Sequence, residues 1–326
     1  MKLALVRFIP TDTNIPFIRL RFAALVASTL LIIGSAAAFF GLGLNFGIDF
    51  RGGTLIEIQT EGPADLGAIR SDLDGLGLGD IQVQAFGAED EVLIRLGTVD
   101  VADVQGLEGV TEETGAEEAQ QIARQTIQET LRAEYPGVEF RRVEVVGPQV
   151  SGELVVAGAT AVLVALFLML VYIWFRFEWQ YSVGAVLALA HDVIATIGMF
   201  AVTQLEFNLS TIAAILTIVG YSMNDTVVIY DRIREKFRKF KTAPTVEVLN
   251  RAINKTLSRT ILTSGTTLVA LIAMALIGGP ALQGFAFALI WGVVIGTYSS
   301  VFVAAPLLTL TGVKRETSQE GEVVAP

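Results

Sequence analysis

The sequence predicts an α-helical membrane protein with six transmembrane helices and one α+β domain between the first and the second helix. Three observations lead to this fold class. Of the 326 residues, 52% are hydrophobic and only 17% are charged. Long apolar runs recur along the chain, each able to cross about 30 Å of hydrocarbon as a helix of roughly 20 residues. The one large polar segment, 41–150, shows the patterns of a folded domain. A soluble single-domain enzyme is therefore not expected.

Six apolar runs are expected to span the membrane, and they lie at 22–40, 154–175, 181–203, 210–230, 261–277 and 285–310. The first run follows Arg19 and Arg21, as the apolar part of a signal peptide would. It is long for that role and five further runs follow, so an uncleaved anchor is favoured. The last run is over-long and contains Gly292, Gly296 and Pro306. These residues predict a tilt, a kink or an interfacial end.

The polar segment is predicted to fold as a ferredoxin-like sandwich. Strand patterns occur in TLIEIQT, IQVQAFG, EVLIRLG and VEFRRVEVVG, and helical spacing occurs in PADLGAIRSDLDGL and at about 113–135. The resulting order βαββαβ is that of one sheet with two helices on one face. The stretch 106–121 is acidic and poor in apolar residues, so we expect a solvated helix start or a loop there rather than a cation site.

The distribution of charge predicts the orientation in the membrane. The segment 41–150 has 7 Lys/Arg against 21 Asp/Glu, whereas the other basic residues lie in the N-terminal arm 1–21, at Arg176, in the loop 231–260 and in the tail 311–326. Alternating spans put these four basic regions on one side, and the positive-inside rule makes that side the cytoplasm. Both termini are thus expected in the cytoplasm, with the 41–150 domain outside and the five-helix bundle 151–310 following it.

The basic run DRIREKFRKFK at 231–241 has two interpretations. A stop-transfer cluster that fixes the topology and touches anionic headgroups accounts for its excess of positive charge. A specific partner or lipid site is the alternative. The overall net charge of −10 argues against nucleic acid as a partner.

Metal and thiol chemistry is not expected. The chain has no cysteine and a single histidine, His191. It therefore has no disulfide framework and no sulfur ligands for zinc, and one imidazole does not anchor a metal site by itself. We expect no cofactor beyond a coupling proton.

Two carboxylates lie inside the predicted spans. Asp192 lies near the middle of the third span, and Asp225 lies roughly 7 Å to the cytoplasmic side of the centre of the fourth. A charged group in hydrocarbon costs a few kcal/mol, so each one needs a partner or a function. Both are candidate proton carriers. Asp192 is the weaker candidate, because with its neighbour His191 it also fits a hydrogen-bonded structural role.

A polar row in the fifth span is predicted to face Asp225. Arg259, Thr263, Thr266 and Thr267 follow one another at helical spacing along one face. An acid that gains and loses a proton beside a permanent cation is a usable switch, because the ion pair loosens on protonation. Beside the acid, Ser222 and Asn224 are expected to line the polar path. The alternative is a structural ion pair between Asp225 and Arg259 that ties two helices together.

The motifs together resemble a known family. GIDFRGGT follows the first span and GPQVSGEL leads into the second, ALAHDV lies in the third, NLSTIAAILTIVGYSMNDTVVIYDRIRE in the fourth and LSRTILTSGTT in the fifth. In this order they resemble the SecF family of the bacterial SecD/SecF protein-export complexes. The resemblance covers nearly the whole chain.

The resemblance implies a bacterial inner-membrane subunit of the resistance-nodulation-division superfamily. Its expected partners are SecD, the SecYEG channel, YajC, the lipid bilayer and unfolded preproteins, whose late export it would promote with the proton-motive force. It also implies that Asp225 and Arg259 couple to protons, while SecD supplies a further Asp. No bond in a substrate changes, so we expect no enzyme. The alternatives are a half-sized exporter of a small molecule or lipid from the same superfamily, and a non-transporting assembly subunit.

Overall fold

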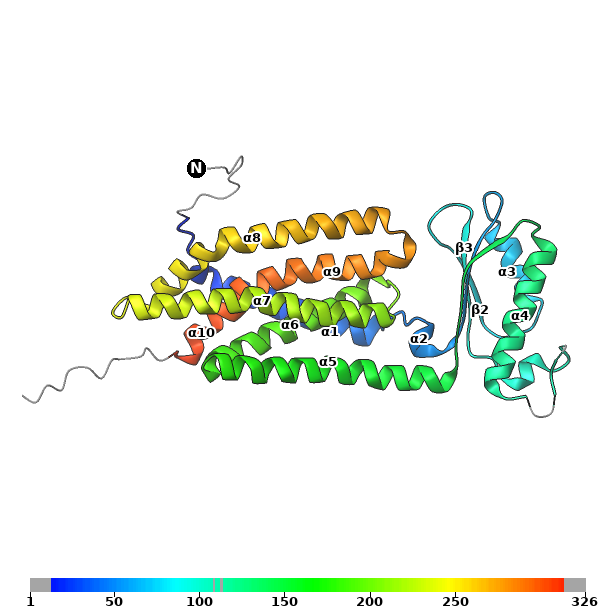
Figure 1. Ribbon diagram of the computed structural model, residues 1–326, viewed down its shortest axis with the longest axis horizontal. Helices are drawn as coiled ribbons and strands as arrows, with labels where there is room; N and C mark the ends of the chain where they lie inside the picture. Colours follow the sequence, from blue (N-terminus) through cyan, green and yellow to red (C-terminus); the bar gives the residue numbers. More distant parts are fainter. Residues whose placement is uncertain (1–12, 108, 112–113, 314–326) are drawn as a thin grey trace, which may run out of the picture.

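The computed structural model describes residues 13–107, 109–111 and 114–313. Much of the expected N-terminal arm, most of the expected tail and part of the acidic stretch 106–121 therefore lie outside the described residues. The molecule is elongated, with a helical bundle at one end and a sheet domain at the other (Figure 1). The two parts meet where the first and second long helices enter the sheet domain.

The six predicted spans are confirmed as long apolar helices. Six helical segments of the described residues are long and apolar enough to cross a membrane. They are α1 (Arg21–Leu42), which follows the 3₁₀ turn η1 (Phe17–Leu20), α5 (Pro148–Arg176), α6 (Trp179–Thr203), α7 (Leu209–Lys239), α8 (Thr245–Ile277), and α9 (Pro280–Ser299), which continues through η3 (Ser300–Ala304) into α10 (Ala305–Thr311).

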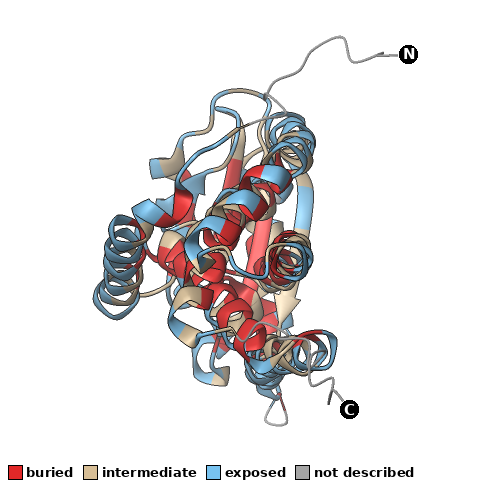
Figure 2. Cartoon of the chain, turned by 90° about the vertical axis from the view of Figure 1, so that its left-hand side faces the viewer, coloured by how far each residue is buried: buried red, intermediate tan, exposed pale blue. Residues whose placement is uncertain are grey.

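The six spans divide into three central and three peripheral helices. Within their most apolar windows, 61% of α6, 50% of α7 and 56% of the α9–α10 span are buried, against 22% of α1, 11% of α8 and 6% of α5. Buried positions accordingly gather in the middle of the bundle, and the outlying helices are largely exposed (Figure 2). The peripheral helices present the surface that must meet lipid or another protein.

The stretch 231–260, expected as a loop, is helical over most of its length. α7 continues to Lys239 and α8 already begins at Thr245. Each of these helix ends carries an ion pair along one helical face, which stabilises the helix there. The pairs are Arg232 with Glu235 on α7 and Arg251 with Glu247 on α8. The break at 240–244 ends at Pro244, the residue directly before α8. A proline is tolerated there because the N–H groups at the start of a helix have no partner within the helix.

The over-long last span is interrupted by a π-helical turn. α9 ends at Ser299, the residues of η3 form wider i→i+5 turns, and α10 carries Pro306 in its first turn. A proline has no N–H to continue the helical ladder, and the wider turn accommodates that loss. The irregularity expected near Pro306 is therefore a π-helical turn that directly precedes α10.

The sheet domain confirms the predicted ferredoxin-like order. Its elements are β1 (Gly53–Gln59), α3 (Leu66–Asp74), β2 (Ile81–Ala85), β3 (Glu91–Leu96), α4 (Ala116–Glu134) and β4 (Glu139–Val146). The strands are antiparallel in the order β2-β3-β1-β4, so β1 pairs with both β3 and β4. The helices cover one face, where inward residues such as Ile56, Ile94 and Ile127 are almost fully buried. Two short elements, α2 (Ile48–Arg51) and η2 (Val101–Val104), were not predicted.

Two consecutive glycines join α2 to β1. Gly52 and Gly53 have φ angles of 75° and 118°, which side chains with a Cβ rarely adopt. A Cβ on Gly53 would also lie 2.3 Å from the backbone oxygen of Leu96. The glycine pair therefore permits the chain to turn from α2 directly into β1, an inner strand of the sheet.

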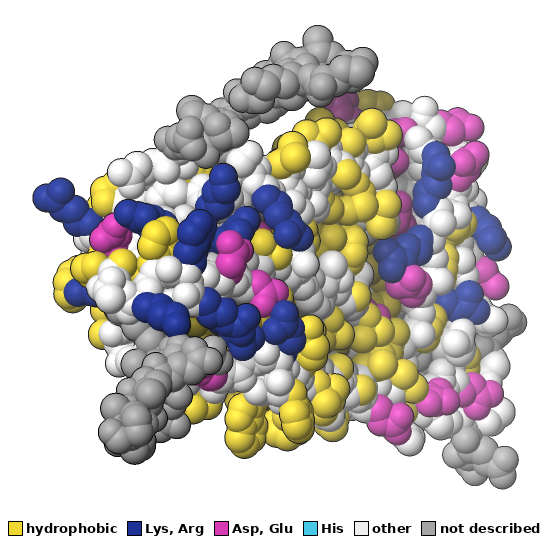
Figure 3. Space-filling model, turned by 60° about the vertical axis from the view of Figure 1, so that its left-hand side comes forward, with side chains coloured by type: hydrophobic (Ala, Val, Ile, Leu, Met, Phe, Trp, Pro, Cys, Tyr) yellow, Lys and Arg dark blue, Asp and Glu magenta, His cyan; other side chains and the backbone are white. Residues whose placement is uncertain are grey.

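The surface of the bundle is zoned along its length. On the face that Figure 3 shows, apolar side chains form a band across the bundle, and Lys and Arg gather beyond it at the end remote from the sheet domain. We call this the basic end. A band of this kind between polar ends is what a membrane-spanning bundle requires.

Candidate functional site

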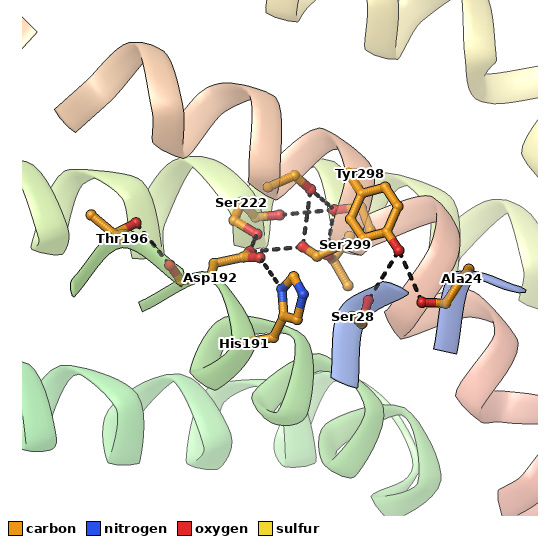
Figure 4. Close-up of polar contacts among 11 residues, drawn as sticks. Ala24, Ser28, His191, Asp192, Thr196, Ser222, Tyr298 and Ser299 are labelled. Atoms are coloured by element: carbon orange, nitrogen blue, oxygen red, sulfur yellow. Dashed lines mark hydrogen bonds and ion pairs between the residues drawn. The ribbon is translucent and has the colours of Figure 1, made fainter. Parts of the chain in front are cut away.

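Asp192 lies at the centre of a buried hydrogen-bond network in the bundle (Figure 4). Its side chain, on α6, is fully buried. Ser222 Oγ of α7 and Ser299 Oγ of α9 both donate to Asp192 Oδ2, at 2.6 and 2.7 Å. The other carboxylate oxygen lies 3.0 Å from His191 Nδ1. Three side chains therefore hold this carboxylate, and the three central helices meet at it.

The network continues towards α1 through an aromatic side chain. The ring of His191 lies 6.1 Å from that of Tyr298, whose hydroxyl donates to the carbonyl oxygen of Ala24 at 3.1 Å. The same hydroxyl lies 3.0 Å from Ser28 Oγ. His191 Nε2 is buried and has no hydrogen-bond partner among the described residues.

Two consecutive serines lie inside the bundle where α9 passes into the π-helical turn. Ser299 and Ser300 are both fully buried. Ser299 is the last residue of α9, and Ser300 is the first residue of η3. Ser299 serves Asp192, and Ser300 Oγ lies 2.8 Å from Thr226 Oγ1 on α7. α9 can approach α7 this closely because Gly296 faces Ser222, where a Cβ would lie 2.9 Å from Ser222 Cβ.

Asp225 is buried with far fewer partners. Thr260 Oγ1 of α8 donates to Asp225 Oδ1 at 2.8 Å. The second oxygen, Oδ2, is buried and has no hydrogen-bond partner among the described residues. Buried polar atoms nearly always have partners, so the unpartnered oxygen makes Asp225 a candidate for a functional role.

The expected contact between Asp225 and Arg259 is not formed in this structure. The Arg259 side chain is exposed and makes no ion pair with any described residue. The cause is the rotation of α8. Thr260 faces α7, and its neighbour Arg259 is turned about 100° away along the helix.

The predicted polar path is only partly assembled. Ser222 takes part, but its partner is Asp192. Asn224 is exposed. The three predicted threonines of α8 donate back to carbonyl oxygens of their own helix, Thr263 to Arg259, Thr266 to Leu262 and Thr267 to Thr263. The polar row of α8 therefore does not reach Asp225.

Other polar residues, which the sequence analysis missed, fill that place. On α8, Thr256, Thr260 and Ser264 are buried at intervals of four residues, and Ser264 Oγ lies 2.7 Å from Thr297 Oγ1. Thr226 follows Ser222 at the same interval on α7. The sequence does contain a signal for these hydroxyls, because they follow one another every four residues along one helical face. Thr256, Thr260 and Ser264 do so on α8, and Ser222 and Thr226 do so on α7. Ser299 and Ser300 carry no such signal.

A clamp joins the bundle to the base of the sheet domain. The α6–α7 loop pairs with the segment that leads to β1. Phe207 N donates to the carbonyl oxygen of Asn45 at 2.8 Å, and Gly47 N donates to that of Phe207 at 2.9 Å. Leu209 N donates to Asp49 Oδ2 at 2.8 Å. These contacts connect the two helices that carry the acids to the strand at the centre of the sheet.

An ion pair and an aromatic cluster strengthen this clamp. Arg95 of β3 pairs with Glu206 in the α6–α7 loop. Phe207 packs against Phe46, Phe50 and Phe200, with ring centroids 5.5–5.9 Å apart. Across the part of the chain that the structure describes, no three His, Asp or Glu side chains gather as a metal ion would need.

Family comparisons agree with this architecture. The family of protein export membrane proteins SecD/SecF, C-terminal, matches residues 126–314, and the SecD/SecF GG motif matches residues 37–64. The second match contains the glycine pair at the start of β1. Among individual proteins, protein translocase subunit SecF of Cereibacter sphaeroides is 45% identical, over 94% of this chain and 92% of its own. SecF of Vibrio alginolyticus is 43% identical, over 95% of this chain and 94% of its own.

Longer relatives contain this chain as one part. Protein translocase subunit SecDF of Brucella abortus is 42% identical over 98% of this chain, which spans only 40% of that protein. The crystal structure of SecDF from Thermus thermophilus, titled a translocon-associated membrane protein, superposes with a TM-score of 0.78 at 35% identity. It covers 93% of this chain, which spans 39% of it. A SecDF structure in a super-membrane-facing form is 36% identical but has a TM-score of 0.65.

The fold and the intramembrane acids define a polytopic membrane protein with a ferredoxin-like domain between its first two spans. The matches cover more than nine-tenths of the chain at more than 40% identity. The chain belongs to the SecD/SecF family of protein export membrane proteins, and it matches the SecF members along nearly their whole length.

Proposed function

We propose that this chain is an auxiliary subunit of the Sec protein translocase. It would use the proton-motive force to promote late steps of preprotein export across the inner membrane, together with SecD and the SecYEG channel. The translocase-subunit names of its SecF relatives and the translocon-associated title of the solved SecDF support this role. YajC is a further expected partner. The scheme makes and breaks no bond in a substrate, so the chain acts as a transport component and not as an enzyme.

The observation that carries the proposal is the unpartnered oxygen of Asp225. A buried carboxylate with one hydrogen bond is costly in its charged form, and protonation removes that cost. We expect a protonated and an ionised state of this acid, and a proton gradient shifts the population between them. Asp192 is a weaker candidate for the same role because its network already satisfies it.

Arg259 would stabilise the ionised state. Its guanidinium cannot deprotonate, and it lies on α8 beside the threonine that already serves Asp225. A rotation of α8 by up to about 100° would exchange Thr260 for Arg259 as the partner of the acid. In this scheme, the arrangement with Thr260 beside Asp225 is the state in which the ion pair is open.

The clamp offers a route from the acid to the sheet domain. A shift of α7 against α6 moves the loop between them. Phe207 of that loop and Leu209 at the start of α7 are hydrogen-bonded to the segment before β1. The two SecDF structures with nearly equal identity but different TM-scores support a family in which shape varies. Proton movement would thus reorient the sheet domain.

We further propose that the sheet domain lies outside the cytoplasmic membrane and both termini inside. The basic end of the bundle supports this orientation under the positive-inside rule. The multi-pass chain would reside in the bacterial inner membrane.

The experiment that tests proton coupling replaces Asp225→Asn. Asparagine is close in shape but cannot ionise, so we expect the proton-motive-force-dependent part of preprotein export into inverted membrane vesicles to be lost. Asp231→Asn is the matched control, because Asp231 is on the same helix but exposed and paired with Arg176. Undiminished, gradient-dependent export by Asp225→Asn would reject the coupling role and favour an assembly subunit. Export measured against separate proton and sodium gradients identifies the ion.

The face that meets SecD is proposed from its polarity. Arg259 and Thr266 on α8, and Thr217 and Asn224 on α7, are exposed within spans. Such groups are costly against lipid, so a protein partner is expected to cover them. The fused SecDF relative supports SecD as that partner.

This face is testable with single cysteines, because the chain contains none. Asn224→Cys should cross-link to a cysteine series in SecD within the membrane. Val164→Cys on the exposed apolar face of α5 is the control and should not. The reverse pattern would move the interface to α5. Loss of small-molecule or lipid efflux with export intact would instead favour the exporter interpretation.

A further inference from the structure

The basic end of the bundle contains a pocket lined by charged side chains. It has a volume of about 580 Å³ and lies between the end of α5 and the last turns of α7. The lining consists of four basic and two acidic residues, namely Arg176, Asp231, Arg234, Glu235, Arg238 and Lys239. The pocket is therefore a concave site of net positive charge.

Two of the arginines are held in position by their neighbours. Arg176 Nη2 donates to both carboxylate oxygens of Asp231, at 2.9 and 3.2 Å. Arg234 Nη1 donates to the carbonyl oxygen of Arg176 at 3.4 Å. Both guanidiniums also lie over the ring of Phe177, 4.8 and 5.5 Å from its centroid, and this ring is buried. Because the cations are already ordered, a ligand would bind without the full cost of fixing them.

The acids do not neutralise the pocket. The carboxylate of Asp231 is paired with Arg176, and Glu235 pairs with Arg232. Arg234 and Lys239 have no acidic partner among the described residues. Positive charge with unused donors therefore remains available to an anion.

The depth of the pocket matches the headgroup layer of a membrane. Trp174 and Trp179 stand on either side of the α5–α6 corner and are 62% and 57% exposed. Exposed Trp at the end of an apolar helix is typical of the membrane–water interface. Towards the sheet domain from this level the surface is the apolar band, and in the opposite direction Lys and Arg gather (Figure 3).

We propose that this pocket binds the phosphate of an anionic phospholipid, of the phosphatidylglycerol or cardiolipin type. A guanidinium offers paired N–H groups that match two phosphate oxygens. The exposed apolar side of α5, with Leu168 and Tyr172, provides the surface along which the acyl chains lie. A soluble phosphate would not gain this contact, so the site selects the lipid. With the orientation proposed above, the lipid belongs to the cytoplasmic leaflet.

The experiment measures lipid retention by the purified full chain with native mass spectrometry. Titration with dioleoyl phosphatidylglycerol should give one tightly held lipid, and dioleoyl phosphatidylcholine should not. Arg234→Gln should weaken phosphatidylglycerol binding about five-fold, since one basic group near a membrane surface contributes about that factor. Lys255→Gln removes an equal charge from an exposed position on α8 outside the pocket and should leave binding unchanged.

Three outcomes would overturn the proposal. Equal retention of the two lipids by the unsubstituted protein shows that the pocket does not select anionic headgroups, and this result needs no variant to fold. An equal loss with Lys255→Gln shows diffuse attraction and no site. Full displacement by millimolar inorganic phosphate shows a soluble-anion site without lipid selectivity.

Discussion

The two intramembrane acids of this bundle have opposite surroundings. Asp192 is fully buried and three side chains from α6, α7 and α9 hold it. Asp225 is buried almost as deeply, but only Thr260 serves it, and one oxygen has no partner among the described residues. Burial alone therefore does not distinguish a structural acid from a working one.

The number of hydrogen-bond partners makes that distinction. A buried network in which several members hold one another is rigid, because removing any member leaves the others without partners. A partly satisfied acid stores free energy that a proton or a cation can release. We accordingly propose that Asp192 mainly holds the three central helices together and that Asp225 is the acid that changes state.

The largest expected difference in stability tests this comparison directly. Asp192→Asn should lower the free energy of unfolding by about 1–3 kcal/mol, because the amide has one acceptor oxygen where the carboxylate has two. Asp225→Asn should leave stability unchanged or raise it, since the neutral amide removes an unsatisfied charge. Thermal unfolding of both variants in the same detergent gives the comparison. Equal destabilisation by the two would contradict it.

A packing change should reach Asp192 without altering its chemistry. In Gly296→Ala the new methyl group would lie 2.9 Å from Ser222 Cβ, so α9 and α7 must move apart. We expect a loss of about 1–2 kcal/mol by overpacking. Gly220→Ala is the control, because a Cβ there meets nothing within 4 Å. If both alanines were neutral in thermal unfolding, the close approach of these helices would not matter.

Removing the single partner of Asp225 should have a smaller effect. Thr260→Val keeps the shape of the side chain and deletes the hydroxyl that donates to the carboxylate. We expect a loss of about 1 kcal/mol, the typical net value of one hydrogen bond. The corresponding change Thr263→Val on the same helix removes only a bond to its own backbone and should cost less. A larger loss for Thr263→Val would show that α8 is rotated differently.

The smallest effect is expected in the sheet domain, at a hydroxyl unconnected with either acid. Burial and a hydrogen bond to Asp72 raise the pKa of Tyr135 from its ordinary 10.0 to about 12. The contribution of this hydroxyl to stability is therefore complete below about pH 10 and is lost as the pH rises towards 12. Tyr135→Phe should remove that pH dependence from alkaline denaturation while export is unchanged. An effect on export would connect this surface to the function.

The sequence was a good guide to elements and a poor one to their contacts. Long apolar runs and period-two strands are local signals, and they predicted all six spans and the sheet order. Asp225 was singled out for the cost of its burial, and its side chain is buried in the bundle. Its expected partner Arg259 was not found beside it, because a helical wheel shows which residues share a face but not which way that face points.

The contact of Asp192 with its neighbour His191 was expected from the sequence, but its partners on other helices were not. Ser299 lies 107 residues away along the chain and reaches the acid only through the packing of α9 against α6. The sequence alone determined that this is a six-span membrane protein with two acids in its spans, because hydrophobic periodicity is fixed by neighbouring residues. Only the tertiary structure decided which acid is satisfied and which is not, because helix rotation and close packing depend on all the helices together.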